Sequence, residues 1–237
     1  MPETLTIERF DEHPIWGACV FFTAQVDDAE AVRDAYAEAA ASLPPLHFAV
    51  AEALPEALDP WYRLGFAQMH AYAARASGGE HFEVPGVTLR PGTVDDLETA
   101  MRIDRLIYDT QAAAPSFSPH APREQEHRES WRETLEADDV TYRIAERDGR
   151  PIGHVTLYPD PTEDDALHLA STAVIPEDRG TGIGRLLTAF ALRQAGELGL
   201  PRLKTNWRVT NLVASRYWPA RGFELTHLRL VRRIGEA

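Results

Sequence analysis

The sequence predicts a mixed α/β fold, in which a mostly antiparallel, twisted sheet is flanked by helices. Strand-like apolar runs alternate with segments of helical periodicity in the second part of the chain. A hairpin turn joins two of these strands, so antiparallel and parallel pairs must share one sheet. The 237 residues are enough for one large domain or two modest ones.

A connector divides the chain. The segment 76–80 reads Ala-Ser-Gly-Gly-Glu, and its Gly and Ser residues cannot build a packed element. We therefore predict a first unit over residues 1–80, a linker over 81–86 and a second unit over 87–237.

The elements of the second unit follow from periodicity and turn residues. Leu97, Met101, Ile103 and Ile107 repeat at helical spacing, and Asp148-Gly149 is a hairpin turn signal. In order, we predict a strand at 87–90, a helix at 95–108, a proline-rich loop at 115–122, a helix at 124–135, strands at 140–146, 152–158 and 167–175, a helix at 183–198 closed by Gly199, a strand at 203–207, a helix at 212–217 and a strand at 223–234.

The composition excludes several classes of protein. With 26% charged residues and no apolar run near the roughly 20 residues of a membrane span, the chain reads as soluble, without membrane association. The first four residues lack the features of a secretory signal. Cys19 is the only cysteine, which excludes an internal disulfide and favours the cytoplasm. The net charge of -13 disfavours nucleic acids and favours an amine substrate.

The most informative segment joins the strand at 167–175 to the helix at 183–198. It contains Gly180, Gly182 and Gly184, which let the backbone approach a ligand closely. The first amides of the following helix are unpaired donors beside a positive dipole end, an arrangement that binds phosphate groups. The spacing matches neither G-x-G-x-x-G nor a P-loop.

These residues resemble the pyrophosphate signature of the GNAT superfamily of acyl-CoA-dependent N-acyltransferases. Arg179, Gly182 and Gly184 match Arg/Gln-x-x-Gly-x-Gly/Ala. A second family motif follows in the correct order, from Asn211 through Tyr217 to Gly222-Phe223. The resemblance covers residues 87–237 and implies a GNAT-type sheet.

The resemblance also implies a donor substrate and its contacts. Acetyl-CoA would supply the acetyl group, with no metal involved, and the backbone amide of Val174 would polarise the thioester carbonyl. The residues expected to contact acetyl-CoA are Thr172, Ala173, Val174, Arg179, Gly180, Thr181, Gly182, Ile183, Gly184, Arg185 and Asn211.

His168 is the first candidate for the general base. It lies six residues before Val174, where members that acetylate protein lysine carry a glutamate. Strand alternation would place 168, 170, 172 and 174 on one face. Histidine accepts a proton near neutral pH, directly or through water. The alternatives are a purely structural histidine, His154, or a carboxylate of the acidic turn Glu163-Asp164-Asp165.

The general acid is harder to assign. The family's tyrosine corresponds to position 218, which is Trp218 here, and an indole is no useful acid. Tyr217 is one residue earlier, about 100° around a helix. Either Tyr217 replaces the family's acid through a shifted register, or solvent protonates the thiolate.

The acceptor is expected to be a primary amine of a small molecule or peptide. In the family, the region corresponding to 108–130 lines the acceptor pocket, so Phe117 is a candidate contact, together with His154. His120 and His127 have no visible third ligand for zinc. Family habit and the acidic surface favour a homodimer.

Part of the first unit is similar in sequence to part of the second, which we call the internal echo. Trp61, Gly65, Phe66 and His70 can be aligned with Trp218, Gly222, Phe223 and His227, and the elements before them have the same order. No glycine stands at the corresponding phosphate loop. We therefore predict a smaller, truncated and degenerate GNAT-like repeat over residues 1–80.

Two functions of different classes fit these features. The first is an acetyl-CoA-dependent N-acetyltransferase that works by direct transfer in a ternary complex. The alternative is a non-catalytic acyl-CoA-binding regulatory protein, which Trp218 favours.

Overall fold

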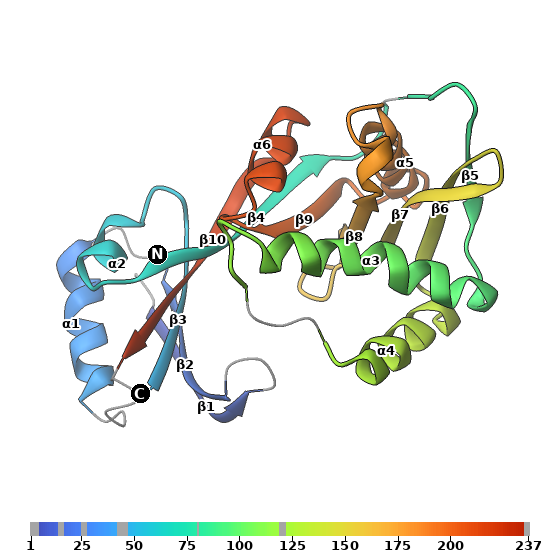
Figure 1. Cartoon of the computed structure of the whole chain (residues 1–237). Coiled ribbons are helices and arrows are strands. Elements are labelled where there is room, and N and C mark those ends of the chain that lie inside the picture. Colours follow the sequence, from blue (N-terminus) through green and yellow to red (C-terminus); the bar gives the residue numbers. More distant parts are fainter. Residues whose placement is uncertain are drawn as a thin grey trace. The chain divides into compact units, whose positions relative to one another are not determined.

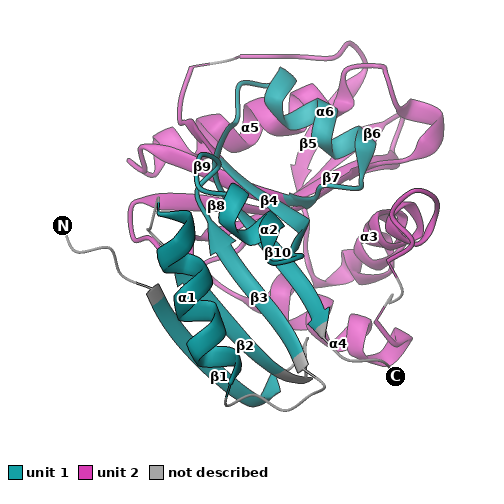
Figure 2. Ribbon diagram, turned by 90° about the vertical axis from the view of Figure 1, so that its left-hand side faces the viewer, with its two compact units in different colours: residues 1–73, 207–237 teal, residues 74–206 magenta. Residues whose placement is uncertain are grey.

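A computed structural model describes residues 5–13, 17–24, 28–41, 47–79, 81–118 and 122–234. The chain forms two compact units, shown in Figure 2: residues 1–73 with 207–237, and residues 74–206. These units do not follow the predicted order along the chain, because the C-terminal segment groups with the N-terminal one. The division into 1–80 and 87–237 stays a prediction about how the chain is organised as domains.

Residues 74–206 contain a mixed sheet with helices on both faces, as predicted. Its elements are β5 (Val87–Pro91), a 3₁₀ turn (Val94–Asp96), α3 (Leu97–Ala112), α4 (Glu124–Glu136), β6 (Thr141–Arg147), β7 (Arg150–Pro159), β8 (Ala166–Val174), α5 (Ile183–Glu197) and β9 (Arg202–Arg208, which crosses the boundary of the unit) (Figure 1). The strand order is β9-β8-β7-β6-β5. Only the β8–β9 pair is parallel.

The two faces of this sheet carry different neighbours. A Cβ added to Gly153 on β7 would meet side-chain atoms of Ile183 and Leu187, so α5 covers that face. On the other face, Trp131 of α4 packs with Tyr142 and the buried residues of α3. Helix α5 and the pair α3/α4 therefore lie on opposite faces of the sheet.

A bulge in β8 changes which residues share a face. Thr156 and Leu157 of β7 are opposite Ser171 and Leu169, so Ala170 is an extra residue in β8. His168 therefore shares its face with Ser171 and Ala173. The expectation that simple alternation puts 168, 172 and 174 together is wrong, because the inserted residue reverses the alternation beyond it.

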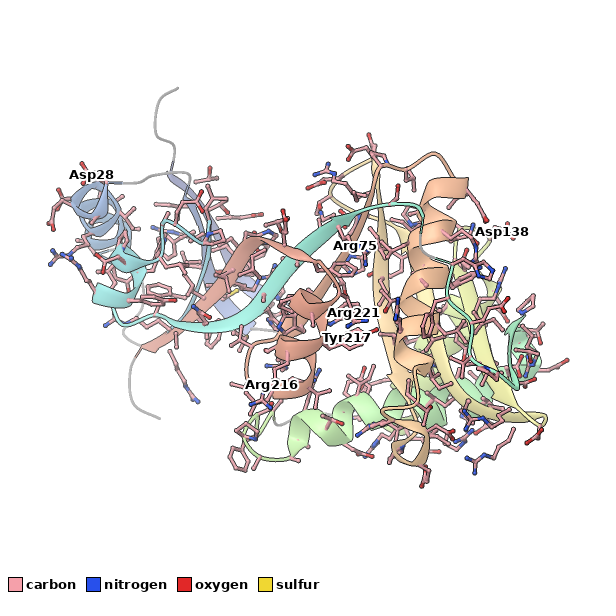
Figure 3. All side chains as sticks on the ribbon, turned by 90° about the horizontal axis from the view of Figure 1, so that it is seen from above. Asp28, Arg75, Asp138, Arg216, Tyr217 and Arg221 are labelled. Carbon is pink, nitrogen blue, oxygen red and sulfur yellow. The ribbon has the colours of Figure 1, made fainter. Side chains whose placement is uncertain are left out.

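The other unit contains β1 (Leu5–His13), β2 (Gly17–Ala24), α1 (Ala29–Ala40), β3 (His47–Ala53), α2 (Asp59–Arg63), β4 (Ala67–Ala76, which also crosses the boundary), α6 (Leu212–Ala220) and β10 (Glu224–Ile234). Its strands follow the order β1-β2-β3-β10-β4, and β2 and β3 are parallel. α1 links the parallel strands β2 and β3, and β10 is antiparallel to β3. Asp28 caps α1 by accepting from the amides of Glu30 and Ala31 (Figure 3). Its core contains Phe22, Tyr36, Trp61, Phe66 and Leu230.

The predicted internal echo has a local structural counterpart. α2 and β4, like α6 and β10, are joined through a glycine with positive φ: Gly65 at 82° and Gly222 at 76°. A shared helix–glycine–strand turn does not by itself confirm a repeat. The tandem origin of the N-terminal segment stays a prediction.

Candidate functional site

The parallel strands β8 and β9 separate part of the way along β8. Their pairing covers 166–169 of β8 and 202–205 of β9, whereas β8 continues to Val174. Beyond Leu169, the backbone groups on this edge of β8 are not paired with β9. Val174 is the last residue on this edge of β8, and its carbonyl accepts from Arg179 instead of from β9.

The glycine-rich loop follows directly and begins α5. Gly180 and Gly182 have φ of 78° and 96°, a region that favours glycine. The Leu186 amide donates to the Gly182 carbonyl as the first bond of the helix. The amides of Ile183, Gly184 and Arg185 precede that bond, so they lie at the helix N-terminus, the kind of place where proteins bind anions.

Asp178, which the sequence analysis did not identify, anchors this loop. Its buried carboxylate binds Arg147 through one oxygen and Arg150, at 3.0 Å, through the other. The Thr181 hydroxyl donates to the Asp178 carbonyl at 2.7 Å. These contacts fix the loop to the β6–β7 hairpin, and nothing in the motif distinguishes this residue as an anchor.

Several other residues that we predicted to contact acetyl-CoA are in contact with groups of this chain. The Thr172 hydroxyl donates to the His154 carbonyl at 3.1 Å, and Arg179 Nε donates to the Val174 carbonyl at 3.1 Å. The Ile183 side chain is buried, so a contact with a ligand would come from its amide. The Arg185 guanidinium lies 4.1 Å from the centre of the Phe82 ring, so the predicted linker at 81–86 packs beside this helix.

His168 is largely buried in a polar environment. Its ring stacks on Tyr158 with 5.1 Å between ring centres, and Nε2 lies 3.4 Å from the Asn206 amide nitrogen. Nδ1 lies 3.3 Å from Asp160 Oδ2. Burial lowers the pKa of His168, Asp160 opposes this shift and Lys204 adds to it. The imidazole is therefore neutral at pH 7 and can accept a proton.

Asp160 and Lys204 form a buried ion pair beside His168. Lys204 Nζ lies 3.1 Å from Asp160 Oδ1, and it also donates to the Thr162 hydroxyl at 3.2 Å. Hydrogen bonds from Thr162 and Lys204 hold the pKa of Asp160 below its usual range, against the effect of burial. Neither residue was predicted, although Lys204 is the only lysine in a chain whose other basic side chains are arginines.

Two of the three carboxylates of the acidic turn form ion pairs. Glu163 binds Lys204 at 3.1 Å and Arg202 at 2.8 Å, and Asp165 binds Arg202 at 2.7 Å. Asp164 is exposed. These ion pairs give Glu163 and Asp165 a structural role at the turn.

His154 belongs to a buried hydrogen-bond chain. Its Nδ1 lies 3.2 Å from the Tyr142 hydroxyl, and its Nε2 lies 3.2 Å from Ser171 Oγ. Ser171 donates to Asp104 at 2.8 Å, where His127 and the Trp131 indole also bind. His154 is 0% exposed, which argues against a direct contact with an acceptor, and its role as a substrate contact stays a prediction.

The second motif lies in the unit formed by residues 1–73 and 207–237. Asn211 caps α6 as predicted, with its side-chain oxygen accepting from the Ala214 amide at 3.2 Å. Trp218 is buried and packs on Trp207 and Phe223. Tyr217 contacts Trp218 edge to face and has Arg221 5.9 Å from its ring centre (Figure 3). The indole at the family's tyrosine position is thus a core residue, and Tyr217 is half-buried.

Phe117 lies just after α3 and is strongly exposed, at 70%. Its φ of 44° is unusual for a bulky side chain. His120 lies outside the described residues. An exposed aromatic ring at this place is free to contact a ligand.

Two features are absent from the part of the chain that the structure describes. No helix there is both long and apolar enough to cross a membrane. Within the same residues, no three His, Cys, Asp or Glu side chains gather where they could hold a metal ion.

Comparison with solved structures places the fold among acetyltransferases. A GCN5-related N-acetyltransferase from Kribbella flavida matches with a TM-score of 0.53 and 19% identity, over 92% of this chain and 82% of that one. A GNAT-family acetyltransferase from Colwellia psychrerythraea matches with a TM-score of 0.56 and 14% identity, over 78% and 65%. A GCN5-related N-acetyltransferase from Sphaerobacter thermophilus gives 0.54 and 12%, over 98% and 77%.

The sequence itself carries the family assignment. No curated protein gives a significant match. The model of the acetyltransferase (GNAT) family matches residues 105–223, which is 119 of the 237 residues and includes the second half of α3, the glycine loop and α6. The match begins before the candidate base and ends at Phe223, so it spans both motifs. This chain therefore belongs to the GNAT family of acetyltransferases.

Proposed function

We propose that this protein is an acetyl-CoA-dependent N-acetyltransferase that acetylates a primary amine of a small molecule or peptide by direct transfer in a ternary complex. The observation that carries this proposal is the separation of β8 from β9 directly before a glycine loop and a helix N-terminus. An acyl donor with a pyrophosphate fits such an arrangement. Apart from Trp218 at the family's tyrosine position, no observation favours the alternative of a non-catalytic regulator.

Each proposed step has a group of this chain to serve it. Loop residues 179–184 would hold the pyrophosphate, and the Val174 amide would donate to the thioester carbonyl oxygen. His168 Nε2 takes a proton from the amine, whose nitrogen forms the new C–N bond as the C–S bond breaks. The electron pair of that bond goes to sulfur, and the thiolate is protonated by Tyr217 or by solvent.

A turnover assay with His168→Ala tests this proposal. Acetyl-CoA would be incubated with a panel of small-molecule and peptide amines, and acetylated products would be detected by mass spectrometry. Loss of the general base should lower kcat about 10²–10⁴-fold with acetyl-CoA affinity unchanged. Binding of acetyl-CoA without turnover of any amine would favour the regulator instead.

A further inference from the structure

The Nδ1 atom of His168 is buried and makes no hydrogen bond of regular geometry within the described part of the chain. It faces the Asp160 carboxylate, with 3.3 Å to Oδ2. An orphaned ring nitrogen beside a buried carboxylate is costly unless the nitrogen carries a proton that points at the charge. This geometry favours the tautomer with hydrogen on Nδ1.

The other ring nitrogen has the opposite environment. Nε2 of His168 lies 3.4 Å from the Asn206 amide nitrogen, which can only donate. Asn206 is exposed, so this side of the ring is the one that an incoming molecule can reach. Both neighbours therefore require the same tautomer, in which Nε2 keeps its lone pair.

Asp160 is fixed independently of the histidine. Its Oδ1 accepts from the Thr162 amide at 2.9 Å, from the Thr162 hydroxyl at 2.5 Å and from Lys204 at 3.1 Å. Oδ2 is left to face His168. Asp160 and Lys204 are 8% and 7% exposed, so neither charge is well screened by solvent.

We propose that Asp160, held by Lys204 and Thr162, is a positioning residue for His168: it keeps the proton on Nδ1, so that Nε2 takes the proton of the acceptor amine. The inference rests on the proposed function for the role of His168, but not for the pairing itself. The charged and titratable groups that face the ring are Asp160 after β7, Lys204 on β9 and Tyr158 on β7. Asp160 raises the affinity of the ring for a proton, whereas Lys204 lowers it.

A nuclear magnetic resonance titration of ¹⁵N-histidine-labelled protein tests the pairing without any substrate. The full chain has nine histidines, and His168→Ala identifies the signal of interest. In the unaltered protein, we expect the Nδ1–H tautomer. In Asp160→Asn, the pKa of His168 should fall and the Nε2–H tautomer should appear.

Two further variants make this experiment specific. Asp165→Asn is the same chemical change in the same β7–β8 connection, but Asp165 binds Arg202, so His168 should titrate as in the unaltered protein. Lys204→Met removes the opposing charge and should raise the pKa of His168. If Asp160→Asn unfolds the protein, the expected rise in the pKa of His168 in Lys204→Met still tests the proposal. An unchanged tautomer and pKa in the folded variants would overturn it.

Kinetics separate the inference from the proposed function. Asp160→Asn should lower kcat about tenfold or more, which is part of the contribution of a general base. In the His168→Ala background, the same change should have no further effect, because Asp160 acts through the imidazole. Equal losses in both backgrounds would overturn the inference. Full activity of His168→Ala would instead remove His168 as the base, while the titration still decides the pairing.

Discussion

At the scale of single residues, His168 is largely buried, yet one of its ring nitrogens lies on an accessible side. Its Nε2 is on the side of exposed Asn206, and its Nδ1 faces Asp160. Burial lowers the pKa of the ring below the ordinary value of 6.5. The imidazole therefore stays neutral to a lower pH than that of an unperturbed histidine.

The pH dependence of acetyl transfer should show this shift. Because only neutral His168 can act as the base, kcat should fall as the pH drops through the lowered pKa of the ring. We expect the midpoint of this acid limb below pH 6.5, measured by product formation at saturating substrates. The limb should be absent from the residual activity of His168→Ala. A midpoint at or above pH 6.5 would contradict the assignment.

His154 should make the fold sensitive to acid. Burial lowers its pKa to about 4, so between pH 6.5 and 4 the unfolded chain binds a proton that the folded chain does not. The stabilisation is therefore complete above pH 6.5 and is lost as the pH falls toward 4. His70, with a pKa of about 4 for the same main reason, acts in the same direction.

Urea unfolding at pH 7 and pH 5 measures this effect. Each of the two histidines should lower the free energy of unfolding by about 2 kcal/mol between these pH values. His154→Gln should remove about half of their combined contribution to the pH dependence, apart from its own cost in stability. An equal pH dependence in the variant and in the unaltered protein would show that His154 is not the group responsible.

Residue-level prediction from the sequence was limited by contacts between distant positions. His168 was proposed from its position six residues before Val174, but its partner Asp160 was not predicted, because only the β7–β8 connection brings the two together. His154 was assigned to a substrate contact on its residue type alone. Its partners Tyr142, Ser171 and Asp104 come from three other elements, which no local pattern reveals.

At the scale of elements, α5 and the strands β7 and β8 determine where the glycine-rich loop lies. Gly153 of β7 allows this close packing: an added Cβ would stand 2.8 Å from the Ala173 carbonyl oxygen and 3.3 Å from Ile183 Cγ2. The first distance is too short for a real contact. β7, β8 and α5 would have to move apart.

Gly153→Ala should therefore destabilise the protein by about 1–3 kcal/mol, measured by urea unfolding, because it overpacks this contact. Gly196→Ala is the comparison. Its new Cβ would meet the Gly78 backbone at 3.3 Å, and a helical alanine gains about 1 kcal/mol of propensity, so the net change should be much smaller. Similar effects of the two substitutions would argue against a tight β7–α5 contact.

The elements themselves were predictable because their signals are local. The helix expected at 183–198 is observed at 183–197, since one apolar stripe and a final glycine define it. The Asp148-Gly149 turn has positive φ at both residues, as its sequence predicts. The bulge at Ala170 was missed, because Ala-Ser-Thr-Ala gives no signal for an extra residue.

At the scale of the whole molecule, the chain order and the compact units differ. β10 is the last strand in the sequence, yet it pairs with β3. We expected it in the domain at 87–237, because the family resemblance covers those residues. The partner of a strand depends on which sheet edges are open to it in the folded chain. The periodicity of residues within a single strand does not show which edge it joins. The fold class was still predictable, since it depends only on the kinds of element and their order.

The central claim is that the chain has one acetyl-CoA site, formed by the loop that begins α5. Calorimetric titration with acetyl-CoA tests it, using the unaltered protein, Gly182→Asp and the control Gly149→Asp. Both substitutions place an aspartate at a glycine of positive φ, 96° and 73°, but Gly149 is in the β6–β7 turn with open space around it. The added carboxylate at 182 should repel the pyrophosphate.

We predict one site per chain, which is lost in Gly182→Asp and retained in Gly149→Asp. Circular dichroism should confirm that both variants are folded. Two sites would contradict the claim by showing a second donor site elsewhere in the chain. No binding to the unaltered protein, or undiminished binding to folded Gly182→Asp, would contradict the donor loop itself.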